Sequence, residues 1–507
     1  MKVNLKSTFS SVTLACLSLC VGWGLSACTV GPDFKKPDLA LPDRYLQTTP
    51  GGSARQVDKP TEAAYLPLDW YSLYQSPVLN RWVEQALTQN PSLDMAQAAL
   101  RAAQASVQAQ QGQFAPQVSA GYEFNRQKTP QVLASPLASN AYVANLHTAQ
   151  VSVAYTFDVF GLNRRNVESA QAQAEGQAAA LAATRQLLVS SVVTAAAQEA
   201  GLREQIALLE AQRQLQQKAL DRTRQFQKMG QVSEADVQFQ VQQVLSLEMQ
   251  LPPLRKQRDQ QLDLLKNLMG AYPADSVGQG FELKDLNLPA NLPLTAPSVW
   301  LSHRPDVRQA EENLHAASAA IGVARANRLP QITLGTTLLG QSSQQWSSLF
   351  SSASQFWSLA GGIVAPVFDG GTLSAREKVA RDNYDQAAAQ YRQTVLAAFQ
   401  NLADSLVAIQ HDDALAKQQL SALKSAEKSA QIAQRQYDAG DQSELSLMAS
   451  QLLVLQAKQA LAQTRVNQLS DVATLCFALG GSWDAASDAA VRPGFQSGLQ
   501  PGLPPAN

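Results

Sequence analysis

Cys28 is the residue of this chain whose type and position most clearly predict chemistry. It follows Leu25-Ser26-Ala27, which ends an apolar run that starts at about Val12, behind two lysines near the amino terminus. The run is too short for a membrane span, so residues 1–27 are interpreted as a signal peptide. We expect cleavage before Cys28, a diacylglycerol on its thiol and an acyl chain on its new amino group. A plain signal peptide with an incidental cysteine is the alternative.

The other cysteines favour structure over chemistry. Cys16 and Cys20 leave with the signal peptide, so Cys476 is the one remaining thiol besides Cys28, and an internal disulfide is excluded. Cys476 continues the three-four spacing of apolar residues along a helix, which predicts a buried structural thiol.

Histidines and acids show no catalytic arrangement. His303 and Asp306 flank Pro305, which is typical of a helix start, where a carboxylate in the first turn is stabilised by the helix dipole. The other histidines lack ligand spacing, and no nucleophile elbow or phosphate loop occurs. The sequence therefore predicts no enzyme, no metal site and no cofactor other than the covalent lipid.

The charge balance limits the partners. The formal net charge is −1 and charged residues make up 16% of the chain, so nothing attracts nucleic acid electrostatically. No run of eighteen apolar residues follows the signal peptide, so we expect no transmembrane helix. If the mature chain enters a bilayer, it must do so as strands.

The elements that position these residues are predicted to occur twice. Pro91 and Pro116 recur as Pro305 and Pro330, both 214 residues later, and Gly230 recurs as Gly440. The predicted order is a signal peptide at 1–27, a lipid-anchored extended segment at 28–69, a first repeat at 70–290, a second repeat at 291–483 and a tail at 484–507.

Four segments alternate apolar and polar residues, at about 114–127, 145–158, 329–341 and 355–368. In the first, Val118, Ala120, Tyr122 and Phe124 interleave with polar residues or glycine. Each segment is about ten residues or a little longer, enough to cross a membrane as a tilted strand. A soluble hairpin would give the same alternation.

Two segments predict very long helices. Residues 161–228 and 371–438 contain no proline and are rich in alanine and glutamine, so each can run unbroken for roughly 100 Å. Return helices are expected at 233–269 and 443–479, after a tip glycine and an N-cap serine. Pro252-Pro253 is expected to kink or interrupt the first of them.

Four membrane strands cannot close a barrel, because an open edge would leave backbone groups unpaired in lipid. The chain is therefore expected to oligomerise, with polar strand faces lining a lumen that the helical hairpins continue. The predicted fold class is mainly α with a membrane β-barrel.

Several motifs, taken in this order, carry a resemblance to a known family. They are Cys28-Thr-Val-Gly-Pro-Asp-Phe34, Asp69-Trp70-Tyr71-Ser-Leu-Tyr74, His303-Arg304-Pro305-Asp306-Val307-Arg308, Ile321-Gly-Val-Ala-Arg325 and Tyr437-Asp-Ala-Gly440. The chain resembles the TolC-like outer-membrane factors of tripartite efflux systems, in particular the lipidated OprM/NodT branch. The resemblance covers almost the whole mature chain.

The resemblance implies a homotrimer with a twelve-stranded barrel and a twelve-helix periplasmic cylinder, which conducts drugs or small toxic compounds passively. It implies a periplasmic membrane-fusion adaptor and an inner-membrane pump of the RND type, or else an ABC or MFS pump. Thr29 after the anchor, in place of aspartate, resembles bacterial lipoproteins sent to the outer membrane. The adaptor contacts implied at the helical tips are Gly230, Gln231, Val232, Ser233, Gly440, Asp441, Gln442 and Ser443.

One stretch departs from the family. Relatives often carry two aspartates after the second tip that constrict the closed pore, whereas this chain has uncharged residues at 445–450. We hypothesise that Asp236 supplies the acidic ring, helped by Glu234 and Glu444. The alternative is that these are solvated acids at helix starts, stabilised by the helix dipole.

Two other functions compete with small-molecule efflux. The same channel could serve a protein-exporting type I secretion system, which neighbouring genes would decide. A periplasmic coiled-coil tether without a pore is a further alternative, which leaves the four amphipathic strands unexplained.

Overall fold

The computed structural model describes residues 29–39, 66–133, 141–276, 278, 280–289, 300–301 and 303–480. The predicted signal peptide, Cys28 and the predicted tail from residue 484 lie outside the described residues. The chain divides into two compact units. Of the described residues, the first unit takes those within 1–38, 99–177 and 310–391, and the second takes those within 39–98, 178–309 and 392–507.

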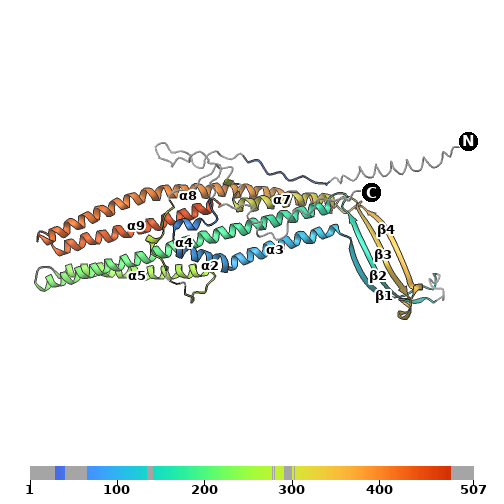
Figure 1. The fold of residues 1–507 in the computed structure, drawn as a ribbon, viewed down its shortest axis with the longest axis horizontal. Helices are drawn as coiled ribbons and strands as arrows, with labels where there is room; N and C mark the ends of the chain where they lie inside the picture. The colour runs from blue at the N-terminus through green and yellow to red at the C-terminus, as the bar shows by residue number, and fades with distance from the viewer. Residues whose placement is uncertain are drawn as a thin grey trace. The chain divides into compact units, whose positions relative to one another are not determined.

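The first unit contains one antiparallel sheet of four strands in the order β1-β2-β3-β4 (Figure 1). The strands are β1 (Gln117–Lys128), β2 (Val143–Phe157), β3 (Gln331–Ser343) and β4 (Gln355–Val364). The prediction placed the end of the fourth strand at residue 368, but β4 ends at Val364. Pro366 follows two residues later and has no N–H to donate to a neighbouring strand.

Helices lead into and out of the sheet. They are α3 (Pro91–Gln111), α7 (Pro305–Ala326) and the first parts of α4 (Leu162–Lys228) and α8 (Thr372–Asp438). Glycines with positive φ, Gly161 at 77° and Gly371 at 88°, precede α4 and α8. Asp158 and Asp369 cap these helix starts, since their carboxylates accept hydrogen bonds from backbone N–H groups of the first turns.

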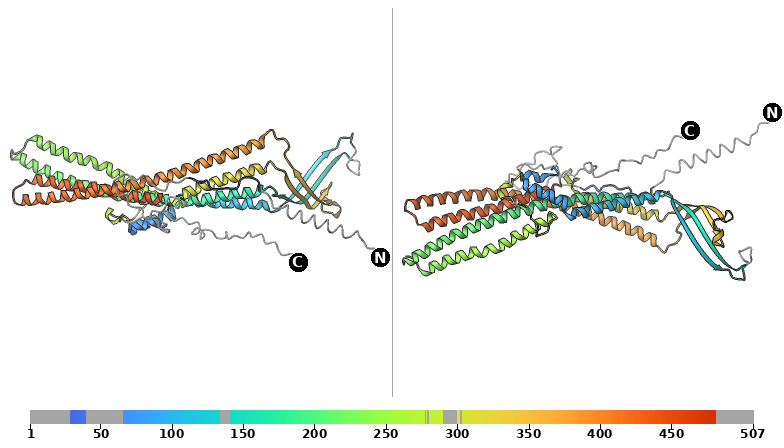
Figure 2. Two further views of the ribbon diagram at one scale, coloured as in Figure 1. Left: turned by 90° about the horizontal axis from the view of Figure 1, so that it is seen from above. Right: turned by 60° about the horizontal axis from the view of Figure 1, so that its bottom comes forward.

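The second unit contains α2 (Pro77–Gln89), α5 (Glu234–Leu268), α9 (Glu444–Ala478) and the remaining parts of α4 and α8. In every view α4 turns back into α5 and α8 into α9, so each pair forms a helical hairpin (Figure 2). Both long helices have 67 residues and both return helices have 35.

The interruption expected at Pro252-Pro253 does not occur, because α5 is a continuous helix from Glu234 to Leu268. Leu251, immediately before the prolines, is buried in a cluster with Ile206 and Leu209 of α4. Packing against the neighbouring helix therefore maintains the helix where two prolines remove backbone donors.

The core of the second unit is packed at close range, as the abundant alanines predict. Ala196 and Ala197 of α4 are fully buried in the same cluster as Leu469 and Cys476 of α9. A Cβ at Gly201 would lie 2.2 Å from Val466 Cγ2, so glycine is needed where α4 approaches α9. Cys476 is 1% exposed and free, and burial raises the pKa of its thiol. The prediction of a buried structural thiol is confirmed.

One described helix, α4, has a stretch long and apolar enough to cross a membrane by composition alone. This finding differs from the expectation that no transmembrane helix follows the signal peptide. Leu188, Val192 and Val193 of α4 are buried in the core cluster, so the apolar character of this helix has a packing cause.

Candidate functional site

The strand register separates an apolar face of the sheet from a polar one. Val118, Tyr122 and Phe124 of β1 pair directly with Val153, Ala149 and His147 of β2 and therefore share one face. That face continues across the sheet through Leu334 and Ile363. Its side chains are exposed, Val118 to 67% and Ile363 to 71%, as expected for a surface that faces lipid.

The opposite face carries short polar side chains. Ser119 pairs with Ser152, and Glu123 with Thr148, while Gly335 pairs with Ala154 farther along β2. Within the described residues β1 and β4 form the two edges of the sheet, each paired on one side. The sheet therefore combines an apolar face, a polar face and two edges available to further strands.

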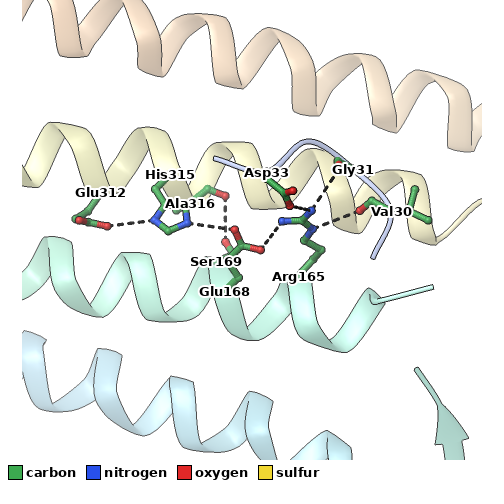
Figure 3. Close-up of polar contacts among 9 residues, drawn as sticks. All are labelled: Val30, Gly31, Asp33, Arg165, Glu168, Ser169, Glu312, His315 and Ala316. Atoms are coloured by element: carbon green, nitrogen blue, oxygen red, sulfur yellow. Dashed lines mark hydrogen bonds and ion pairs between the residues drawn. The ribbon is translucent and has the colours of Figure 1, made fainter. Parts of the chain in front are cut away.

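The amino-terminal segment Thr29–Leu39 is bound to the helices beside the sheet (Figure 3). Its anchor is Arg165 of α4, whose side chain is 3% exposed. The guanidinium donates to Asp33 Oδ1 at 2.8 Å and, more weakly, to the carbonyl oxygens of Val30 and Gly31 at 3.3 and 3.4 Å. It also pairs with Glu168 at 2.6 Å.

Small residues allow this close approach. A Cβ at Gly31, where φ is 111°, would lie 2.5 Å from Gly322 Cα of α7. A Cβ at Gly322 would lie 2.8 Å from Arg165 Cγ and 2.9 Å from the Val30 carbonyl oxygen. The glycine of the Thr-Val-Gly-Pro-Asp-Phe motif is therefore required by contact with the backbone of α7.

His315 of α7 extends the same contact (Figure 3). Its Nε2 lies 3.1 Å from Glu168 and its Nδ1 lies 3.4 Å from Glu312. Phe34 stacks on the imidazole at 4.5 Å between ring centroids. Farther along the segment, Lys36 pairs with Glu311 at 2.7 Å. The contacts of Glu168, Phe34 and Lys36 with α7 were missed from the sequence, because these partners are more than 130 residues apart.

The junction between β4 and α8 holds a buried carboxylate among three arginines. Glu377 of α8 accepts hydrogen bonds from Arg381, Arg328 and Arg325, which lower its pKa to about 2. The side chain of Glu377 is 9% exposed, whereas the arginines are about one third to one half exposed. This group ties α7 to α8 beside the sheet.

The helical tips have nearly identical backbone geometry. Gly230 has φ of 73° and Gly440 has φ of 81°, a conformation that favours glycine at a helix C-terminus. Ser233 and Ser443 then cap α5 and α9 through their hydroxyl oxygens, which accept from the N–H of the third helical residue. The predicted contact residues lie together at these tips: Gly230, Gln231, Val232, Ser233, Gly440, Asp441, Gln442 and Ser443.

The three acids proposed for the aperture lie at the same two helix starts. Asp236 completes a capping box, since its Oδ2 accepts from the Ser233 hydroxyl at 2.7 Å and the Ser233 N–H at 2.8 Å, which lowers its pKa. Glu234 accepts hydrogen bonds from Gln238 and Gln227, which lower its pKa. Glu444 forms an ion pair with Arg222 of α4, which joins the two hairpins. The capping geometry fits the alternative that these are solvated acids at helix starts. Their role in constricting a pore stays a hypothesis.

Asp306, beside His303 in the sequence motif, takes part in a structural contact. Asp306 pairs with the buried Arg304 at 2.6 Å, and Arg304 also donates to the Ala478 carbonyl oxygen at 2.7 Å. Trp300 donates to the same oxygen at 3.0 Å. The motif at 303–308 therefore holds the start of α7 against the end of α9, in agreement with a structural role.

An antiparallel sheet with one apolar and one polar face, together with two long helical hairpins, is typical of an outer-membrane channel. The model of the family "Outer membrane efflux protein" matches residues 82–271 and 296–481. The chain belongs to this family and is an outer-membrane efflux channel protein.

Three known proteins illustrate the relationship. The "Antibiotic efflux pump outer membrane protein ArpC" of Pseudomonas putida is 28% identical over 475 residues, covering 93% of this chain and 96% of ArpC. "Outer membrane protein OprJ" of Pseudomonas aeruginosa is 28% identical over 487 residues, covering 95% and 98%. The structure of the outer-membrane channel OprN superposes with a TM-score of 0.78 at 27% identity, covering 90% of this chain and 100% of OprN.

Proposed function

We propose that three copies of this chain close one twelve-stranded barrel and one twelve-helix periplasmic tunnel. The observation that carries the proposal is the four-stranded sheet, whose edge strands β1 and β4 are each paired on one side. In lipid, every unpaired backbone group costs several kcal/mol, so the edges need partners from other copies. The internal duplication predicted from the sequence fits this design. The two 67-residue helices and the two 35-residue helices would supply four tunnel helices per copy, or twelve in a trimer.

The lipid on Cys28 would anchor the chain at the boundary between strands and helices. Thr29 lies beside this boundary: a Cβ at Gly161, between β2 and α4, would be 2.7 Å from Thr29 Cγ2. The Val30 N–H donates to the Phe160 carbonyl oxygen at 3.2 Å. A lipidated residue immediately before Thr29 can therefore reach the membrane surface where β2 ends.

The proposed role is a passive exit duct for drugs or small toxic compounds, without catalysis. The name of the relative ArpC, an antibiotic efflux pump protein, supports this class of cargo. A periplasmic adaptor would dock at the exposed tips around Gly230 and Gly440 and link the duct to an inner-membrane pump, of the RND type or else ABC or MFS. Asp236 of each copy, with Glu234 and Glu444, would form the acidic aperture.

The first test is the native mass and conductance of the mature protein in detergent and in planar bilayers. A trimer with step-like conductance is expected, and a folded monomer without conductance would refute the shared barrel. Asp236→Ala should then change cation selectivity, whereas Ser446→Ala, at the equivalent uncharged position of the second tip, should not. Unchanged selectivity in Asp236→Ala would remove the aperture hypothesis and leave the channel.

A further inference from the structure

An aromatic cluster surrounds a histidine, His147, which pairs with Phe124 in the part of the sheet that leads away from α3 and α4. On the apolar face, Tyr122 OH and His147 Nδ1 lie 2.8 Å apart, and the Phe124 ring is 4.8 Å from the imidazole. Trp346, which follows β3, meets the Tyr122 ring edge-on at 5.4 Å. Tyr122 is 53% exposed and Trp346 is 58% exposed, so the rings form an open surface.

Two cations continue this surface. Residues 117–157 and 331–364 contain three formally charged side chains, Glu123, Arg126 and Lys128. Arg126 and Lys128 follow Phe124 at two-residue spacing, so they share its outward face, while Glu123 is on the opposite face. Both cations are exposed, and within the described part of the chain neither makes an ion pair.

The order of aromatic and cationic side chains along β1 indicates where the strand meets the membrane interface. A cation on the lipid-facing side of a strand is costly at the membrane centre and tolerated near the interface, and aromatic rings mark that interface. Arg126 and Lys128 therefore lie in the head-group layer, on the side away from α3 and α4. Pairing of β1 with another strand would cover backbone groups and leave the outward side chains in place.

We propose that Arg126, Lys128, Tyr122 and Trp346 bind the phosphorylated sugar head group of an outer-leaflet glycolipid. The Cα atoms of Arg126 and Lys128 are about 7 Å apart along the strand, and the guanidinium and the ammonium suit phosphate oxygens. The exposed rings of Tyr122 and Trp346 suit the apolar C–H faces of sugar rings, which a glycerol phospholipid lacks. The inference rests on the proposed function in one respect, that the strands cross the outer membrane.

The test measures binding of fluorescent bis-phosphorylated lipid A to the full mature protein in detergent, by anisotropy. Arg126→Gln with Lys128→Gln should weaken binding about thirtyfold, and Lys128→Gln alone about fivefold. Trp346→Ala should weaken binding of phosphorylated and dephosphorylated lipid A alike, because it removes the sugar contact. Arg376→Gln with Lys378→Gln is the matched control, since these exposed cations are also two residues apart but lie on α8.

Two outcomes would overturn the proposal. In one, the Arg126 and Lys128 double variant binds lipid A as tightly as the unchanged protein. In the other, phosphatidylglycerol competes as well as lipid A, which would make the surface a general anionic contact. Conductance measured in parallel separates this result from the channel itself, because the double variant should conduct normally; loss of conductance in the unchanged protein would refute the proposed function instead.

Discussion

Replacing Asp471 by asparagine should stabilise the contact between α8 and α9 at neutral pH and leave it unchanged in acid. Asp471 of α9 shares a hydrogen bond with Asp412 of α8, and the pKa of Asp471 is raised to about 6 by burial, by that hydrogen bond and by the charge of Asp412. The folded state therefore holds a proton that the unfolded state releases at lower pH.

The sign and size follow from this shift. Between pH 3.8 and about 6 the folded state binds more protons, so stability falls as pH rises through that window. The full shift corresponds to about 3 kcal/mol above pH 6. Because both carboxylates are partly exposed, solvent screening reduces this to about 1–2 kcal/mol. Asp471→Asn removes the charge, and its new amide can donate to Asp412.

Hydrogen exchange of the backbone measures this directly. Peptides covering 405–420 and 465–478 should exchange about 5- to 30-fold more slowly in Asp471→Asn than in the unchanged protein at pH 7.5. At pH 4 the two proteins should match. Asp413→Asn is the control. Asp413 accepts a hydrogen bond from Gln468 at 2.9 Å, so its partner in that bond is an amide and not a carboxyl group. If exchange in Asp471→Asn were slowed equally at both pH values, or not slowed at pH 7.5, the carboxyl pair would not destabilise the folded state at neutral pH.

Three further predictions concern the anchor segment and the core thiol. Arg165→Ala should speed trypsin cleavage after Lys35 about 10- to 100-fold, because the charged hydrogen bonds that hold the segment are lost. Gly322→Ala should have the same effect, because its Cβ would lie 2.8 Å from Arg165 Cγ; Gly112→Ala, with open space around its Cβ, should cleave at the native rate. Cys476 should resist thiol reagents at pH 8 in the native protein and react once per chain in denaturant, since it is 1% exposed and burial raises its pKa.

The helices and strands could be predicted because their signals are local. Alternation at 118–124 and proline-free stretches each specify an element within a short window, so expected and observed bounds differ by a few residues. The interruption predicted at Pro252-Pro253 was wrong. Proline removes backbone hydrogen-bond donors, but the packing of Leu251 on α4 outweighs that local effect.

The interactions of the candidate sites could be predicted much less well. Arg165 contacts Asp33, and Tyr122 contacts Trp346, across 132 and 224 positions respectively. No periodicity connects residues so far apart. Gly31 belongs to the motif that carries the family resemblance, and its close approach to Gly322 is the physical reason that a glycine is needed there.

The two tips are capped alike but differ in charge at the third helical residue. Ser233 and Ser443 both accept from the third helical residue, so either tip is capped without an acid. In the first tip that third residue is Asp236, whose carboxylate in turn accepts a hydrogen bond from the Ser233 N–H. In the second tip the third residue is Ser446. The anionic form of Asp236 is therefore favoured by its own helix whether or not it faces a pore. A trimeric aperture made of residues 236 and 446 would carry three carboxylates at this level, all from Asp236, so Asp236→Ala should remove all three and leave Glu234 and Glu444 as the remaining acids of the proposed aperture.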